Sequence, residues 1–460
     1  MKIESVGMAE YRLQVFGRLI KKIAVFIARQ GGSTPTGKEA KGERAYLPFG
    51  SMKTPIFNRE TAEFCEDRNL RIIVLTSGWR TLEVLAKSKS MTPFLRKLLS
   101  QNWLLLVNTL ALAIFGVIAI YSATPMRGDS FAADFWRKQA NWVAVGFFAF
   151  MVASLIDYRW IRWGALPMYL AGIVFLILTH FIGQRVYGAR SWLHLGPINF
   201  QPAQLAIVAG IMVLALFLTQ FREIHPMLRL LLCGAIAAAP CLFILMQPAL
   251  GSVIMWIPVL LAMLFVAGLP LRYLICVILI GIAFVPIALH LGMKPYQQQR
   301  ITAFINPEID KKGAAWAINQ SLIAIGSGGW SGKGFKAPNT QIELGFLPAT
   351  AVHNDYIFSA IGEQWGFVGG IFLIGAFALL LLTCLFVAFF AGDQLGLLLV
   401  VGMTALIFTH IFQNMGMTIA LLPITGVPLP LISYSGSFVL MIMFGLGLVN
   451  SVWIHRHVPA

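Results

Sequence analysis

Ten long apolar stretches follow one another between residues 103 and 454, and they constrain the fold more than any other feature. Most of them reach the roughly 20 residues that a helix needs to cross the hydrocarbon core of a bilayer. A segment in lipid must satisfy its own backbone hydrogen bonds, which a helix does. The sequence therefore predicts an all-α polytopic membrane protein with about ten transmembrane helices. The predicted spans are residues 103–123, 141–157, 163–182, 203–220, 228–246, 250–270, 272–291, 356–391, 395–417 and 434–454.

The composition agrees with lipid as the main solvent. Hydrophobic residues make up 58% of the 460 residues and charged residues only 12%, whereas a water-soluble domain carries roughly a quarter charged residues. The five cysteines include no CxxC pair, so the sequence indicates neither a disulfide framework nor a zinc site.

Residues 1–90 differ from the rest and form a basic N-terminal extension before a predicted membrane domain at 91–460. The first 100 residues hold 18 Lys/Arg and 9 Asp/Glu, which is more than half of the net charge of +16. Met8–Gln30 has the pattern of a basic amphipathic helix, and residues 31–50 that of a linker. This charge favours contact with anionic membrane lipids and not with nucleic acid, because no nucleic-acid-binding module is present. Alternatively the extension is an over-called start, since Met91 begins a natural lead-in to the first span; no function is assigned to it.

Basic residues in the short loops predict the orientation in the membrane. With the N-terminus inside, most of them are cytoplasmic, as the positive-inside rule expects: Arg159, Arg162, Arg222, Arg229, Arg272 and Arg456. Five residues oppose this orientation: Arg127, Arg137, Lys138, Arg185 and Arg190. Both termini are then cytoplasmic, and the large loop between spans 7 and 8 (292–355) is extracytoplasmic, together with loops 184–202 and 418–433. Long ordered loops often carry function, so we expect the active face there.

Three outer segments carry extended motifs. They read GARSWLHLGPINFQPAQ (188–204), GSGGWSGKGF running on to QIELGFLPATAVHNDYIFSAIGEQWG (326–366), and NMGMTIALLPITGVPLPLISYSGS (414–437). In this order they resemble the signatures of the SEDS (FtsW/RodA/SpoVE) family of peptidoglycan glycosyltransferases. The run PITGVPLP (423–430) is more similar to the RodA-like, elongation form than to the division form. The resemblance extends over residues 100–455.

The resemblance implies polymerisation of lipid II, the undecaprenyl-pyrophosphate-linked disaccharide-pentapeptide, into glycan strands at the bacterial inner membrane. An acceptor hydroxyl then attacks the anomeric carbon of the donor sugar, and the lipid pyrophosphate leaves. Such a reaction needs a carboxylate to accept the hydroxyl proton and cations to stabilise the pyrophosphate. A divalent cation, Mg²⁺ or Mn²⁺, is possible, although no cofactor is indicated with certainty.

Asp355 is the candidate catalytic base. It ends the large loop, begins a membrane helix, and matches the aspartate of the family's H-T-D-F-I-F motif. An acidic residue at membrane depth is a functional suspect. The alternative is a simple N-cap, a position that aspartate also favours.

Candidate substrate-binding residues surround this motif in the sequence. Lys333, between two glycines, and Arg190 are candidate pyrophosphate contacts, with ordinary surface solvation as the alternative. Trp192 could stack on a sugar or anchor its loop, and His353 could orient Asp355 or serve only structure. Neutral hydrogen bonds to the substrate, or helix-to-helix bonds within the membrane, are the two roles open to the remaining candidates. These are Gln201, Asn414, Ser433 and Ser437.

Several positions depart from the family's motifs. Ser191 stands where the family has arginine, Gln204 and Ile207 replace an acid–lysine pair, and Ala249 and Ala349 replace two further acids. Ser435 replaces a glycine. The effect of these changes on activity stays open at this point.

The resemblance also implies partners: a class B penicillin-binding protein that crosslinks the strands, and the elongation machinery. Two other functions compete with polymerisation. One is a flippase for the lipid-linked precursor, since midplane polar residues and broken helices also occur in transporters. The other is a catalytically weak scaffold for the penicillin-binding protein, which the missing acids would explain.

Overall fold

A computed structural model describes residues 92–124, 134–186, 189–195, 198–247, 249–291, 295–305, 313–348 and 351–457. All of them belong to the unit Ile73–Ala460. The predicted amphipathic helix Met8–Gln30, the linker after it and Arg127 lie outside the described residues. The domain boundary near residue 90 stays a prediction.

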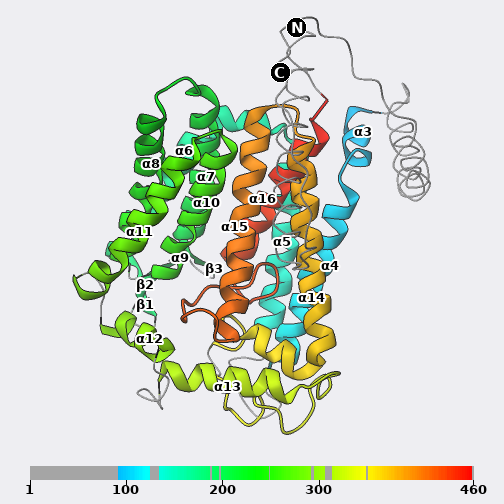
Figure 1. Ribbon diagram of the computed structural model, residues 1–460. Helices are drawn as coiled ribbons and strands as arrows, with labels where there is room; N and C mark the ends of the chain where they lie inside the picture. Colours follow the sequence, from blue (N-terminus) through cyan, green and yellow to red (C-terminus); the bar gives the residue numbers. More distant parts are fainter. Residues whose placement is uncertain are drawn as a thin grey trace, which may run out of the picture. The chain divides into compact units, whose positions relative to one another are not determined.

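Helices occupy every one of the ten predicted spans (Figure 1). Two further helices, α12 and α13, lie in the large loop, and a short helix, α3, precedes the first span. The helices are α3 (Pro93–Leu99), α4 (Trp103–Ser122), α5 (Phe135–Leu155), η1 (Tyr158–Trp160), α6 (Ile161–Ile182), α7 (Pro202–Gln220), α8 (Pro226–Met246), α9 (Leu250–Ile254), α10 (Trp256–Val266), α11 (Leu271–Leu291), α12 (Pro295–Ile305), α13 (Ala314–Ser327), α14 (Ile357–Phe389), α15 (Gln394–Thr418) and α16 (Gly436–Ile454).

Seven stretches of the described chain are helices long and apolar enough to cross a membrane. They are α4, η1 with α6, α7, α8, α14, α15 and α16. The predicted sixth span is divided into α9 and α10 at Met255. The predicted second span, α5, begins with Arg137 and Lys138 in its first turn, which lowers its apolarity. The fold is the predicted helical membrane architecture, while the number of crossings stays a prediction.

The loop between α6 and α7 forms a small antiparallel sheet that the sequence pattern did not indicate. Its strands are β1 (Gln184–Val186), β2 (Ala189–Leu195) and β3 (Ile198–Phe200), in the order β1-β2-β3. Leu193 pairs with Phe200, and Leu195 with Ile198. Short hairpin strands satisfy each other's backbone groups where a loop meets a membrane domain.

The helices α7, α15 and α16 form the centre of the unit, since most of their residues are buried. Small residues allow close helix approach, as membrane helices commonly require. At Gly447 of α16, for example, an added β carbon would lie 2.9 Å from both the Cα of Phe150 and the Cβ of Ala153 on α5. Around this centre, α6 packs on α7, and α4 and α13 pack on α14.

The sheet, α12, α13 and the segment 418–435 gather at one end of the helices (Figure 1). Hydrogen bonds join these segments to one another. The backbone N–H of Tyr434 donates to the carbonyl of His353 (2.8 Å), and that of Gln201 donates to Oγ of Ser437 (3.1 Å). The three motif-bearing segments therefore meet at a common end.

Candidate functional site

Asp355 closes the turn that leads into α14. Its backbone N–H donates to the carbonyl of Ala351 (2.8 Å). The N-cap position of α14 is held by Tyr356, which makes no side-chain cap bond, so the capping role is not the one that Asp355 occupies. Asp355 as a residue is partly accessible.

Arg300 on α12 lies on the same side of Gly426 as Asp355. A β carbon added at Gly426 would lie 3.4 Å from Oδ2 of Asp355 and 3.9 Å from Nη1 of Arg300. The guanidinium also donates a long hydrogen bond to the carbonyl of Ile424 (3.5 Å). The carboxylate of Asp355 and the guanidinium of Arg300 therefore border the same space beside Gly426.

The electrostatics of this space suit a proton acceptor. The surrounding protein desolvates the Asp355 carboxylate, and this desolvation raises its pKa to about 6. The positive charge of Arg300 opposes the rise by favouring the ionised form. A base with a pKa close to the operating pH is both ionised and able to take a proton.

Gly426 has a left-handed backbone with φ of +68°. Side chains rarely adopt this conformation, and a β carbon would point at the carboxylate. Glycine at this position thus keeps the space between Asp355 and Arg300 open.

Asn414 links the backbone at Asp355 to the backbone at Val427. It is fully buried on α15, and its Nδ2 donates to the carbonyls of Asp355 (3.1 Å) and Val427 (2.7 Å). Both bonds use the backbone of the site and leave the carboxylate free of this contact. Asn414 therefore lies beside the site in a positioning role.

Ser433 and His353 also lie behind the site. Oγ of Ser433 donates to the carbonyl of Asn354 and accepts from the N–H of Leu429 (2.8 Å). His353 is 2% exposed and packs edge-on against Phe135, with ring centroids 5.2 Å apart. These contacts fix the turn before Asp355 against the segment 429–435.

Lys333 is engaged in an ion pair that the sequence did not predict. Its Nζ lies 2.7 Å from Oε1 of Glu363, a fully buried residue in the second turn of α14. The same oxygen accepts from the N–H of Gln341 (2.7 Å), while the N–H of Lys333 donates to the carbonyl of Glu363 (2.9 Å). This pairing fastens the glycine-rich loop to α14.

The remaining candidates are placed on the sheet and at its junction with the helices. Arg190 and Trp192 are on β2, where Trp192 is partly buried and pairs with Gln184. The side chain of Arg190 is outside the described part of the chain. Gln201 precedes α7, and the buried Ser437 anchors it to α16.

The departures from the family's motifs have local explanations. Ser191 is buried, and its hydroxyl donates to the carbonyl of Gln247 (3.3 Å). Ile207 is part of the main hydrophobic core, and Gln204 is buried one turn before it. The loss of both members of an acid–lysine pair avoids a single charge left unpaired in this core. Ala249 packs in a small apolar cluster, and Ala349 lies outside the described residues.

Sequence reasoning missed Arg300 and the role of Glu363. Arg300 ends the run YQQQR (296–300), and its cation in an otherwise polar helix was the available signal. For metal binding, the described residues include no group of three or more His, Cys, Asp or Glu side chains. A divalent cation does not fit a site built from this chain's described side chains alone.

Comparison with known proteins gives matches over the part of the chain that contains these motifs. The model of the cell cycle protein family FtsW/RodA/SpoVE matches residues 102–458. The peptidoglycan glycosyltransferase RodA of Treponema pallidum is 31% identical over 424 residues, covering 76% of this chain and 97% of the relative. The peptidoglycan glycosyltransferase MrdB of Escherichia coli K12 is 34% identical over 354 residues, covering 76% and 93%.

Two solved structures share the fold. A chain from a peptidoglycan synthase complex that coordinates polymerization and crosslinking superposes with a TM-score of 0.66 at 25% identity, over 78% of this chain and 99% of the other. The rod shape determining protein RodA of Thermus thermophilus gives 0.59 at 27% identity, over 78% and 98%. Sequence motifs, helix order and these relatives agree, and the chain belongs to the FtsW/RodA/SpoVE family.

Proposed function

We propose that this protein polymerises lipid II into glycan strands and that Asp355 is the base for the acceptor hydroxyl. Family membership and the peptidoglycan glycosyltransferase relatives support the enzyme class. The observation that carries the residue assignment is the placement of Asp355, a partly accessible residue with a pKa raised to about 6, near Arg300 at Gly426.

In this reaction Asp355 takes the proton of the acceptor sugar's hydroxyl as the oxygen attacks the donor's anomeric carbon. The new glycosidic bond forms while the bond from that carbon to the lipid pyrophosphate breaks, and the pyrophosphate leaves with the bonding electrons. Arg300 lies within reach of the same space and stabilises the negative charge that develops there. Asn414, Ser433 and His353 keep the backbone on either side of Asp355 in place.

The proposed setting is the bacterial inner membrane, with the loop end of the helices extracytoplasmic and both termini cytoplasmic. A class B penicillin-binding protein is the proposed partner, because the similar solved chain comes from a complex that combines polymerization with crosslinking. Membership in the elongation machinery is proposed from the RodA-like run 423–430 and from relatives named RodA and MrdB.

Substitution of the proposed base tests this assignment directly. In Asp355→Asn the side chain keeps its shape and loses its basicity, so lipid II polymerisation by the purified protein with its partner should fall by about 10²- to 10⁴-fold. Asp134→Asn is the matched control, because Asp134 is an exposed carboxylate whose contact is Arg137 at 3.4 Å. Glycan strand length and yield are measured on gels, with equal thermal stability of the variants as the folding check.

Unchanged strand synthesis in Asp355→Asn would refute the proposed base. Transfer of fluorescent lipid II across vesicle membranes without any polymer would instead favour the flippase. Binding of the penicillin-binding protein without polymer from any lipid II preparation would favour the scaffold.

A further inference from the structure

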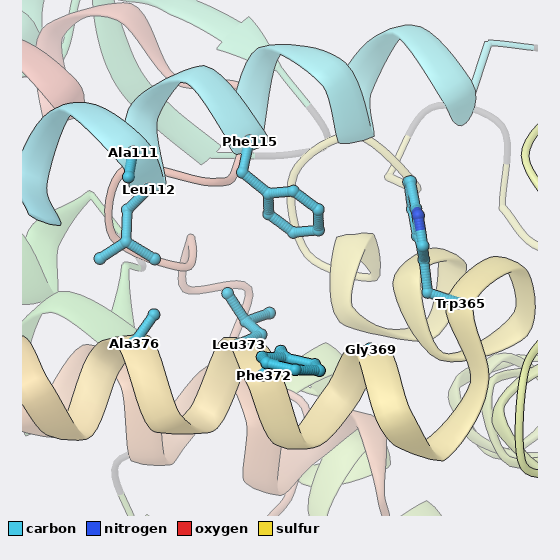
Figure 2. A pocket seen from close by; sticks show the side chains of 8 residues that line it. All are labelled: Ala111, Leu112, Phe115, Trp365, Gly369, Phe372, Leu373 and Ala376. Carbon is cyan, nitrogen blue, oxygen red and sulfur yellow. The ribbon is translucent and has the colours of Figure 1, made fainter.

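A groove runs between α4 and α14 at a distance from the residues around Asp355. The two helices are joined at two points. Nδ2 of Asn108 donates to the carbonyl of Ala376 (2.9 Å), and Nε2 of Gln364 donates to the carbonyl of Ser122 (3.1 Å). Between these bonds the helices leave a cavity of about 320 Å³ (Figure 2).

Small residues help to explain why this space is not filled by the protein itself. Ala111 on α4 lies opposite Ala376 on α14, and Gly369 contributes no side chain further along α14 (Figure 2). The helix α14 is also kinked at Gly366, where φ is +63°. After the kink α14 stays beside α4, since Asn108 bonds the carbonyl of Ala376.

All side chains that line the groove are apolar. Leu112 and Leu373 form its buried floor, and Phe115 and Trp365 stand at one end (Figure 2). Phe372 lines the opposite wall and is 75% exposed, so the groove opens on the surface of two helices that are apolar enough to cross a membrane. Water would find too few polar partners in such a space, whereas a hydrocarbon chain regains the lost dispersion contacts.

An aromatic and cationic cluster continues from the Trp365 end of the groove. The ring of Trp365 lies 6.0 Å from that of Phe335, and the ring of Phe335 lies 6.2 Å from that of Tyr121. The ammonium of Lys336 lies 3.7 Å from the centre of the Tyr121 ring. Aromatic side chains with a nearby cation are typical of the region where lipid headgroups lie.

The charge of Lys336 is available to a ligand. Within the described residues, no carboxylate oxygen lies within 4.0 Å of its ammonium. The nearby Lys333, in contrast, is neutralised by Glu363. One uncompensated cation beside an apolar groove is complementary to a molecule with one hydrocarbon chain and one negative charge.

We propose that the groove between α4 and α14 binds an anionic phospholipid. One acyl chain lies along Leu112, Phe115 and Leu373, and the phosphate meets the ammonium of Lys336 beside Tyr121. The bound lipid fills the cavity and joins α4 to α14 between their two hydrogen bonds. Its affinity should depend on the negative headgroup as well as on the chain.

Thermal unfolding of the full chain in detergent tests the proposal. Phosphatidylglycerol should raise the Tm of the wild type by about 2–4 °C more than phosphatidylcholine with the same acyl chains. Lys336→Gln should abolish the difference between the two lipids, and Ala111→Phe, which fills the groove, should reduce the effect of both. The matched controls are Arg272→Gln, another cation over a tyrosine ring, and Ala144→Phe, at an exposed position of α5; both should keep the wild-type difference.

An equal Tm rise with both lipids in the wild type would overturn the proposal, as would a full difference retained in Lys336→Gln. Photo-crosslinking in native membranes, with a benzophenone amino acid in place of Ala111, identifies the occupant independently. A product with the mass of one phospholipid is expected. A product with a second protein would show that a partner's helix occupies the groove and would also overturn the proposal.

Discussion

At the scale of single residues, the site depends on the balance between Asp355 and Arg300. Burial raises the pKa of the carboxyl group to about 6, and the guanidinium limits that rise. A base acts only when it is ionised, so the enzyme should lose activity as the pH falls through the pKa of Asp355. This falling part of the plot of activity against pH is its acidic limb. The pH at which the limb lies reports the charge around the carboxylate directly.

We therefore expect the rate of lipid II polymerisation to fall about tenfold per pH unit below about pH 6. In Arg300→Gln the opposing cation is lost, so the pKa of Asp355 rises and the limb moves to higher pH. Arg300→Lys keeps the charge and should keep the limb near its original position. Initial rates across this pH range measure the shift, and identical limbs in wild type and Arg300→Gln would show that the cation does not act on the carboxyl.

The proximity of Arg300 and Asp355 to Gly426 also shows where sequence reasoning ends. The resemblance to the family's motif made Asp355 the candidate base, and an acidic residue at membrane depth added to that prediction. Its neighbours Arg300 and Gly426 are 55 positions before it and 71 after it. Their approach depends on how α12 and the segment 418–435 fold back over α14, which no local pattern encodes.

At the scale of elements, the Lys333–Glu363 pair fastens the glycine-rich loop to α14. The sequence indicated Lys333 as a candidate pyrophosphate contact, with ordinary surface solvation as the alternative. Glu363 is fully buried and Lys333 is 28% exposed, so the two members differ in how well they tolerate loss of the other. A double-mutant cycle separates the structural role from a catalytic one.

Lys333→Met leaves a buried carboxylate without its cation and should lower the free energy of unfolding by about 3–5 kcal/mol. Glu363→Gln should cost less, because the lysine can turn toward solvent. The double variant should recover much of the stability lost in Lys333→Met. If the recovered double variant also regains polymerisation, Lys333 has a structural role; a stable but inactive double variant would support the pyrophosphate contact.

The kink at Gly366 is the second feature of α14 that positions the glycine-rich loop. Its φ of +63° suits glycine, and an added β carbon would clash with the backbone nitrogen of Gly332. Gly366→Ala should therefore destabilise the protein by at least ~2 kcal/mol. Gly370, in the same helix with no atom within 4 Å of an added β carbon, is the matched control.

Gly370→Ala should be neutral or stabilising by up to about 1 kcal/mol, since alanine favours helix. Thermal unfolding of both variants measures the difference. Equal stability of the two would mean that the kink does not depend on the glycine.

The helices at the ten apolar stretches were predictable because membrane helices depend on composition and length, which are local properties. The small sheet at 184–200 was missed since its strands are only three to seven residues long. Asn414, Ser433 and Ser437 were singled out as polar residues that could form neutral hydrogen bonds. In the structure they form hydrogen bonds with backbone groups. Their role in substrate binding stays a prediction.

At the scale of the whole membrane domain, the motif-bearing loops lie at one end of the helices and the short basic loops at the other. Asp355 precedes α14, whose other end leads to Asp393, and Asp393 lies 3.5 Å from Arg159. The sheet precedes α7, whose other end leads to the turn that contains Arg222 and Glu223. The motif-bearing loops and the basic short loops are thus separated by the length of a helix, as a polarised membrane enzyme requires.

This separation predicts which end faces outward. In a variant without its native cysteines, Ser331→Cys reports the glycine-rich loop and Glu223→Cys the turn after α7; both positions are exposed. The positive-inside rule predicts that Arg222 and Arg159 are cytoplasmic. A membrane-impermeant maleimide should therefore label Ser331→Cys in intact spheroplasts and Glu223→Cys only after lysis. The reverse pattern would leave the fold unchanged and place the Asp355 end in the cytoplasm, where extracytoplasmic glycan synthesis could not use it.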